Sequence, residues 1–234
     1  MTSTPRPPVI LPRRDLLRGA GALGAGAAMS LAGAPRALAA PSAQVLGSTC
    51  TLTPSSIEGP FWFDSMLVRR DITEGLPGVP MVFYVRVLDD DGCTPVPGAV
   101  VDVWHCEALG AYSGYASQGT AGMTWLRGIQ LADMRGIAWF QTVFPGWYPG
   151  RTTHVHVKVN PTAKTELTTQ VYFADELSER IHALPPYDAH GQNPTRNRDD
   201  AFFLPQTVAG HLTWTDVAGA RRLRLFSGLT IVID

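Results

Sequence analysis

Hydrophobic and polar residues alternate in several short stretches of the chain, and this period of two is typical of strands with one face in a core. The clearest stretch is His-Val-His-Val-Lys-Val at residues 154–159, where a β-branched valine occupies every second position. Such stretches predict six strands, which are Met81–Leu88, Ala99–His105, Ala138–Thr142, His154–Val159, Thr168–Tyr172 and Gly228–Ile233. The pattern therefore predicts a protein built mainly from short strands.

The segments between these strands carry turn signals and little helical periodicity. Asp89–Gly92 predicts a turn between the first two strands, and Asp175–Ala183 predicts one short helix that ends before Pro185 and Pro186. Tyr187–Pro205 predicts a polar loop that covers one end of the fold. With 19 prolines, 23 glycines and no strand–helix alternation, we expect an all-β fold, a β-sandwich with long loops and little helix.

The first 39 residues predict a targeting signal. Arg13 and Arg14 form a twin-arginine start, a Gly/Ala-rich apolar run follows to about Gly33, and Ala37-Leu38-Ala39 fits a cleavage site. The weak hydrophobicity of the run argues against the alternative, a membrane anchor. We expect residues 1–39 to be a signal peptide, residues 40–234 to form a single domain, and the protein to be periplasmic or extracellular.

The charge of the chain limits the kinds of partner that it could bind. The formal charge is −1, and removal of residues 1–39 takes away five arginines and one aspartate and leaves −5. With only two lysines, the mature chain has no basic footprint for nucleic acid or an anionic membrane. Short acidic runs such as Asp199-Asp200 and Asp89–Asp91 are expected to be solvated turns.

The three cysteines permit one disulfide and leave one thiol in an exported protein. Cys50 and Cys93 lie in irregular segments, which favours their pairing. A Cys93–Cys106 bond is the alternative, and the sequence leaves the choice open.

One strand offers a candidate metal site. His154 and His156 are two residues apart on a predicted strand, so both imidazoles point to the same face, roughly 7 Å apart. Such a pair alone is often a hydrogen-bonded surface pair. Two Pro-Gly turn signals just upstream are expected to present Tyr148 and Arg151 beside the start of the strand.

A second segment, Val100–Tyr115, is a strand that runs into a glycine-containing loop bearing a tyrosine. The two segments together resemble the iron-binding core of the intradiol ring-cleavage dioxygenases. The matching pieces are Asp102-Val103-Trp104 with Gly110-x-Tyr112, Arg127-Gly128, Phe144–Arg151 and His154-x-His156. The resemblance runs from about Cys50 to the C-terminus, and the Cys50-Thr-Leu-Thr-Pro start with Glu58–Phe61 resembles a secreted branch of the family.

The resemblance implies one iron(III) per chain, held by Tyr112, Tyr148, His154 and His156. Tyrosine has a pKa near 10, so it binds as phenolate at neutral pH only to a hard, highly charged metal. Zinc sites favour Cys, His and carboxylate, and no acidic residue follows the His pair to complete a two-His, one-carboxylate iron(II) site. Tyr115 is a rival to Tyr112, whose spacing from Trp104 and Gly110 matches the family better.

The resemblance further implies a reaction between a catechol-type aromatic diol and dioxygen, with cleavage between the two hydroxyl-bearing carbons to a cis,cis-muconate. Tyr148 would leave the metal and accept a substrate proton, and Arg151 would stabilise negative charge on the substrate. Gln170 would hold Arg151 or an oxygen intermediate, or would simply face outward from its strand.

A hydrophobic arm precedes the first strand. Gly59, Pro60 and Phe61 are expected to line the substrate pocket. The aromatic group Phe61-Trp62-Phe63 is equally consistent with ordinary core. Catechol, hydroxyquinol, protocatechuate and larger lignin-derived catechols remain alternatives, as do monomer and oligomer. The competing function is a non-catalytic, secreted β-sandwich binding module, since a sandwich does not itself imply catalysis.

Overall fold

A computed structural model of the chain describes residues 50–161, 166–215 and 223–234. The predicted signal peptide, residues 1–39, and the predicted domain start at residue 40 lie outside the described residues. Within the described part, no helix has the length and apolar character that a membrane span requires.

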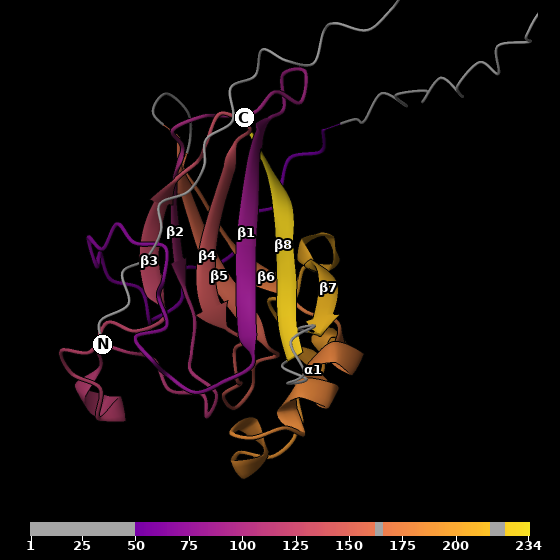
Figure 1. Cartoon of the computed structure of the whole chain (residues 1–234). Helices are drawn as coiled ribbons and strands as arrows, with labels where there is room; N and C mark the ends of the chain where they lie inside the picture. The colour runs from indigo at the N-terminus through magenta and orange to yellow at the C-terminus, as the bar shows by residue number, and fades with distance from the viewer. Residues whose placement is uncertain (1–49, 162–165, 216–222) are drawn as a thin grey trace, which may run out of the picture. The chain divides into compact units, whose positions relative to one another are not determined.

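Two four-stranded sheets lie face to face (Figure 1). One sheet has the order β4-β1-β8-β7 and the other β3-β2-β5-β6. The strands are β1 Pro80–Asp89, β2 Val100–Trp104, β3 Arg127–Leu131, β4 Ile137–Val143, β5 His154–Asn160, β6 Leu167–Tyr172, β7 Gly210–Thr215 and β8 Leu223–Ile233. Neighbours are antiparallel except β1 and β8, which are parallel. This arrangement confirms the predicted all-β sandwich.

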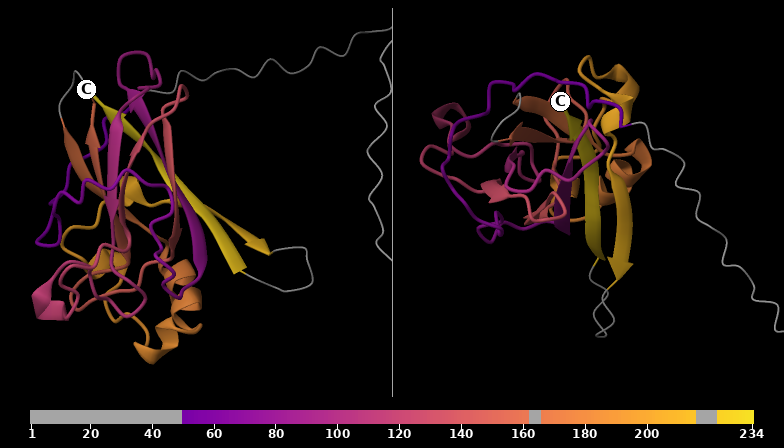
Figure 2. Two further views of the ribbon diagram at one scale, coloured as in Figure 1. Left: turned by 60° about the vertical axis from the view of Figure 1, so that its left-hand side comes forward. Right: turned by 90° about the horizontal axis from the view of Figure 1, so that it is seen from above.

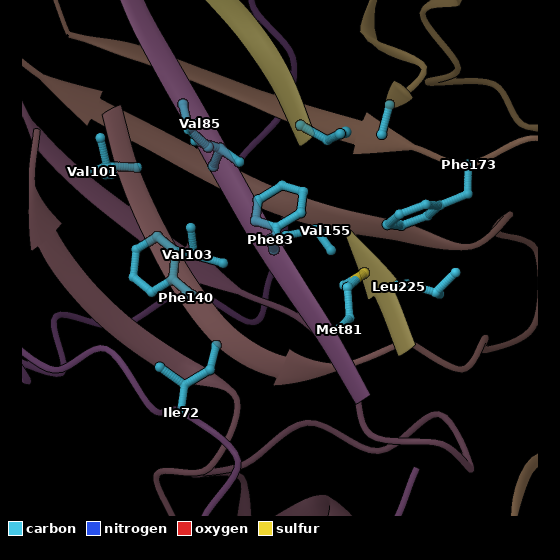
Figure 3. Packing of buried hydrophobic residues seen from close by; sticks show 14 of the residues in the cluster. Ile72, Met81, Phe83, Val85, Val101, Val103, Phe140, Val155, Phe173 and Leu225 are labelled. Carbon is cyan, nitrogen blue, oxygen red and sulfur yellow. The ribbon is translucent and has the colours of Figure 1, made fainter. Parts of the chain in front are cut away.

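The core fills the space between the sheets (Figure 3). Phe83 and Val85 of β1 point inward, as do Val155 and Val157 of β5, because alternate strand residues face opposite sides. The histidines and the lysine of β5 therefore lie on the outer side of their sheet.

All six predicted strands are present, but the structure adds β3 and β7 and starts β8 at Leu223 instead of Gly228. The prediction started the last strand at Gly228. In the structure a Cβ at Gly228 would lie 2.1 Å from the Tyr84 carbonyl oxygen, so this position inside the strand needs a glycine. β3, Arg-Gly-Ile-Gln-Leu, was not predicted, because its burial does not follow polarity: Arg127 is buried and Leu131 is exposed.

The one predicted helix is confirmed as α1, Asp175–His182. Short 3₁₀ turns at Ala116–Gln118, Tyr187–Ala189, Asn197–Asp199 and Pro205–Thr207 punctuate the long loops. Figure 2 shows that α1 and the β2–β3 loop gather at one end of the sandwich, with the C-terminus at the other. Cys50 and Cys93 form a disulfide and Cys106 is a buried free thiol, so the favoured pairing is confirmed.

Candidate metal centre

Four strand ends meet where the candidate residues lie. In the register, Trp104 at the end of β2 pairs with both Arg127 of β3 and His156 of β5, and His154 pairs with Tyr172 at the end of β6. The loops that leave these ends, residues 105–126 and 144–153, therefore close over the outer face of β5 and bring in Tyr112 and Tyr148 from distant parts of the sequence.

The two histidines face each other on β5. Both are buried, and their Nε2 atoms are 3.2 Å apart. His154 Nδ1 lies 2.7 Å from the carbonyl oxygen of Thr152 and donates to it, which leaves the lone pair on Nε2. The His156 ring stacks on Trp104, with ring centroids 4.8 Å apart. Two imidazoles thus direct their Nε2 atoms toward one point.

Both histidines are neutral. Burial, aided by the positive charge of Arg151, lowers the pKa of His154 to about 3. Burial and the neighbouring His154 lower the pKa of His156 well below its ordinary value. Neutral imidazole is the form that binds a metal.

The two tyrosines complete the cluster. Tyr148 Oη lies 3.2 Å from His154 Nε2, and the Tyr112 ring lies 5.7 Å from the Tyr148 ring and 6.3 Å from the His156 ring. The Tyr112 hydroxyl is buried and has no hydrogen-bond partner among the described residues. Tyr115, the rival, is half-buried and donates from Oη to the Trp62 carbonyl at 3.2 Å. The structure therefore places Tyr112, and not Tyr115, beside the histidine pair.

These side chains fit a hard, highly charged cation. Burial raises the pKa of Tyr148 to about 12 and raises that of Tyr112 well above its ordinary value, so without such a cation both phenols keep their protons. An orphaned buried phenol is costly, and a cation between it and the imidazoles would satisfy it. The described part of the chain contains no group of three His, Cys, Asp or Glu side chains that could hold a metal.

Arg151 is fixed by three partners. Its Nε donates to Asp200 at 2.9 Å, its Nη1 to Tyr148 Oη at 3.3 Å, and its Nη2 to Gln170 Oε1. The Asp200 side chain is fully buried and also accepts from the Thr152 amide at 2.8 Å. The prediction that Asp200 is solvated was wrong, because the 144–153 loop folds over it. No local signal in the sequence distinguishes it from Asp199, whose side chain is about half exposed.

Gln170 lies opposite His156 in the register and is fully buried. Besides its contact with Arg151, its Oε1 accepts from Tyr172 Oη at 3.1 Å, and its Nε2 donates to the Ile57 carbonyl at 2.9 Å. It therefore joins Arg151 to the N-terminal arm and does not project into solvent.

The arm covers the cluster. The Phe61 ring stacks on Tyr112, with centroids 4.4 Å apart and planes inclined by 15°, and meets Tyr148 edge-on. Gly59 has φ +76°, and a Cβ there would touch His156 Cε1 at 3.4 Å. Pro60 is exposed. Two of the three predicted arm residues thus lie against the cluster.

Two supporting groups were outside the predicted site. Arg127 is fully buried and donates to Ser113 Oγ at 2.9 Å and to the Ser113 carbonyl, which holds the loop of Tyr112. Lys158, on the same face of β5 as the histidines, pairs with Glu58 and lies over the Trp62 ring. The sequence could have placed Lys158 on this face, because it lies four residues after His154 and alternate residues of a strand share a face.

Comparison with known proteins matches the chain to dioxygenases. A family model described as dioxygenase matches residues 57–181. A chlorocatechol 1,2-dioxygenase from a Pseudomonas species is 36% identical over 112 residues, which cover 40% of this chain and 43% of that protein. A catechol 1,2-dioxygenase from Acinetobacter lwoffii is 30% identical over 141 residues, covering 50% of this chain and 45% of that protein. The chain thus matches less than half the length of these two relatives.

Solved structures match a larger share of the chain than these two relatives do. An intradiol ring-cleavage dioxygenase from Tetranychus urticae superposes with a TM-score of 0.69 at 26% identity, covering 79% of this chain and 95% of that one. The dioxygenase domain of a dioxygenase carbohydrate-binding fusion from Streptomyces sp. SirexAA-E gives 0.59 at 28% identity, covering 79% and 99%.

Proposed function

Because the chain belongs to the family of intradiol ring-cleavage dioxygenases, we propose that it is a non-haem iron(III) enzyme. Its substrates would be a catechol-type aromatic diol and dioxygen, and its product a cis,cis-muconate-type dicarboxylic acid. One observation carries the proposal: the buried phenol of Tyr112, the half-buried phenol of Tyr148 and two neutral imidazoles converge, and the two Nε2 atoms lie 3.2 Å apart.

Tyr112, Tyr148, His154 and His156 would hold the iron. When bound, iron(III) would act as a Lewis acid that withdraws electron density from a catecholate and makes its ring reactive toward dioxygen. Trp104 and Thr152 fix the orientations of the two imidazoles, so the donor set is organised before the metal arrives.

Tyr148 is the residue placed to take a proton. Its Oη lies between His154 Nε2 and Arg151 Nη1, so a phenolate there is stabilised on one side by the guanidinium. As substrate enters, this oxygen would accept a hydroxyl proton from the diol, in keeping with the raised pKa of this half-buried phenol.

Arg151 supplies a fixed positive charge. Asp200 and Gln170 hold the guanidinium, so it does not need to reorganise when negative charge develops on the substrate. Preorganised charge in a site shielded from water is the strongest common contribution to catalysis. Phe61 and Gly59 shield the cluster and offer an apolar surface suited to an aromatic ring.

Oxygen uptake by the iron-loaded full chain over a panel of catechols tests the proposal. We expect consumption of one dioxygen per diol and a ring-opened dicarboxylic acid with both new oxygens derived from dioxygen. Binding of catechols with no oxygen uptake by any panel member would contradict catalysis and favour a non-catalytic binding module.

A further inference from the structure

The outer face of the β4-β1-β8 sheet carries aromatic side chains. Tyr84 of β1 pairs in the register with Trp139 of β4 on one side and with Gly228 of β8 on the other. Since Gly228 has no side chain, the Tyr84 ring leans over β8 and stacks on Phe226, with centroids 5.1 Å apart and planes inclined by 28°. Phe226 stays 42% exposed. Three rings therefore lie side by side on a face that sandwiches usually leave polar.

These rings form the floor of a groove of about 540 Å³. Its volume lies within the range of small-molecule sites, roughly 300–1,000 Å³, and aromatic lining is typical of them. Val82 and Ile137 extend the apolar floor. The groove is large enough for a ligand of one or two rings.

Arginines border the groove. Arg224 of β8 and Arg135 from the β3–β4 loop line it, and no acidic residue is among its described lining residues. Arg135 pairs with Asp133 at 3.0 Å, whereas Arg224 is exposed and has no ion pair within the described ranges. Arg70 lies 4.0 Å from the Trp139 ring centroid at the side of this face. The groove thus presents aromatic surface beside a free guanidinium.

We propose that this groove binds a soluble aromatic carboxylate. Its ring would stack among Trp139, Tyr84 and Phe226, and its carboxylate would accept the parallel N–H pair of Arg224. A second copy of the chain fits less well, because a two-fold contact through this face would bring the arginines of both copies together.

The groove is separate from the candidate metal centre. His154 and His156 project from the outer face of the other sheet, and both sheets and the hydrophobic core lie between the two sites. The groove therefore represents a second ligand site, and its ligand does not compete with the diol proposed for the metal centre.

Calorimetric titration of the full chain with 2-naphthoate tests the proposal. We expect Arg224→Gln and Phe226→Thr each to raise the Kd for 2-naphthoate at least about 10-fold, as loss of a charge-assisted pair or a stacked ring should. Threonine keeps β propensity, and thermal melting verifies the fold. Oxygen uptake with catechol should be unchanged in both variants.

Matched controls separate the alternatives. Arg198→Gln removes an exposed arginine from the 197–199 turn and should leave the Kd unchanged. The neutral amide 2-naphthamide should bind at least about 10-fold more weakly than 2-naphthoate. Equal binding of the amide, or an unchanged Kd in both groove variants, would overturn the proposal. A dimer abolished by Phe226→Thr, with no naphthoate binding, would assign the face to a second copy instead.

Discussion

At the scale of single residues, Arg151 is expected to matter for turnover but not for binding of the iron. It contacts Tyr148 and Gln170 and pairs with Asp200, but it is not one of the four proposed ligands. We expect Arg151→Ala to keep the iron colour and the spectral change on adding catechol, while turnover falls roughly 10²–10³-fold, the usual cost of one preorganised electrostatic contact. Stopped-flow spectra and oxygen uptake measure the two effects.

Arg151→Lys is the matched control, since lysine keeps the charge but cannot contact three partners in a fixed fork. It should recover only part of the turnover. Near-normal turnover of Arg151→Ala would make the residue a bystander, and loss of iron would make its role structural.

His105 makes stability depend on pH. It is buried, with Nδ1 2.8 Å from the Cys106 carbonyl and Nε2 2.7 Å from Thr142 Oγ1. Burial lowers its pKa to about 4, so between about pH 6.5 and 4 the unfolded chain binds a proton that the folded chain refuses. The free energy of unfolding therefore falls with falling pH in this window, by up to about 1.4 kcal/mol per pH unit for this group.

His105→Gln keeps hydrogen-bonding capacity but cannot titrate. Urea unfolding from pH 7 to pH 4.5 should show a smaller loss of stability with acid in this variant than in the parent chain. Identical slopes would show that His105 is not a source of the acid sensitivity.

At the scale of elements, the N-terminal arm depends on a cross-link. The Cys50–Cys93 disulfide spans 43 residues and ties the arm to the β1–β2 turn. Replacing both cysteines with serine should lower the free energy of unfolding by about 2–4 kcal/mol, because the unfolded chain regains loop entropy. Denaturant unfolding measures the difference, and reductant should bring the parent chain to the level of the variant. Equal stability of parent and variant without reductant would contradict a stabilising role.

The strands and loops also show how much of the structure could be predicted from the sequence. Strands such as β5 were predictable because the valines alternate with polar residues and one face must be buried. β7 was not predicted, because its position is set by pairing with β8 and not by an alternation of hydrophobic and polar residues in its own sequence. The two histidines and two tyrosines were recognisable from short motifs. The burial of Asp200 was not, because it depends on contacts between loops that are about 50 residues apart.

At the scale of the whole molecule, we propose that the chain is exported by the twin-arginine route. Arg13→Lys combined with Arg14→Lys should leave uncleaved precursor inside the cell, since the pathway reads the arginine pair. Cell fractionation with immunoblotting measures the distribution. Arg6→Lys with Arg36→Lys, outside the pair, is the control and should be exported normally. Normal export of the first variant would refute the assignment.

We propose that Tyr112, Tyr148, His154 and His156 form one iron(III) site. Metal analysis together with the visible absorption spectrum of the iron-loaded full chain tests it most directly, because phenolate-to-iron(III) charge transfer gives a broad visible band. We predict about one iron per chain and a band that is lost or strongly weakened in Tyr112→Phe but kept in Tyr115→Phe. A colourless protein after iron loading, stoichiometric zinc, or a band that survives Tyr112→Phe and disappears in Tyr115→Phe would contradict the account.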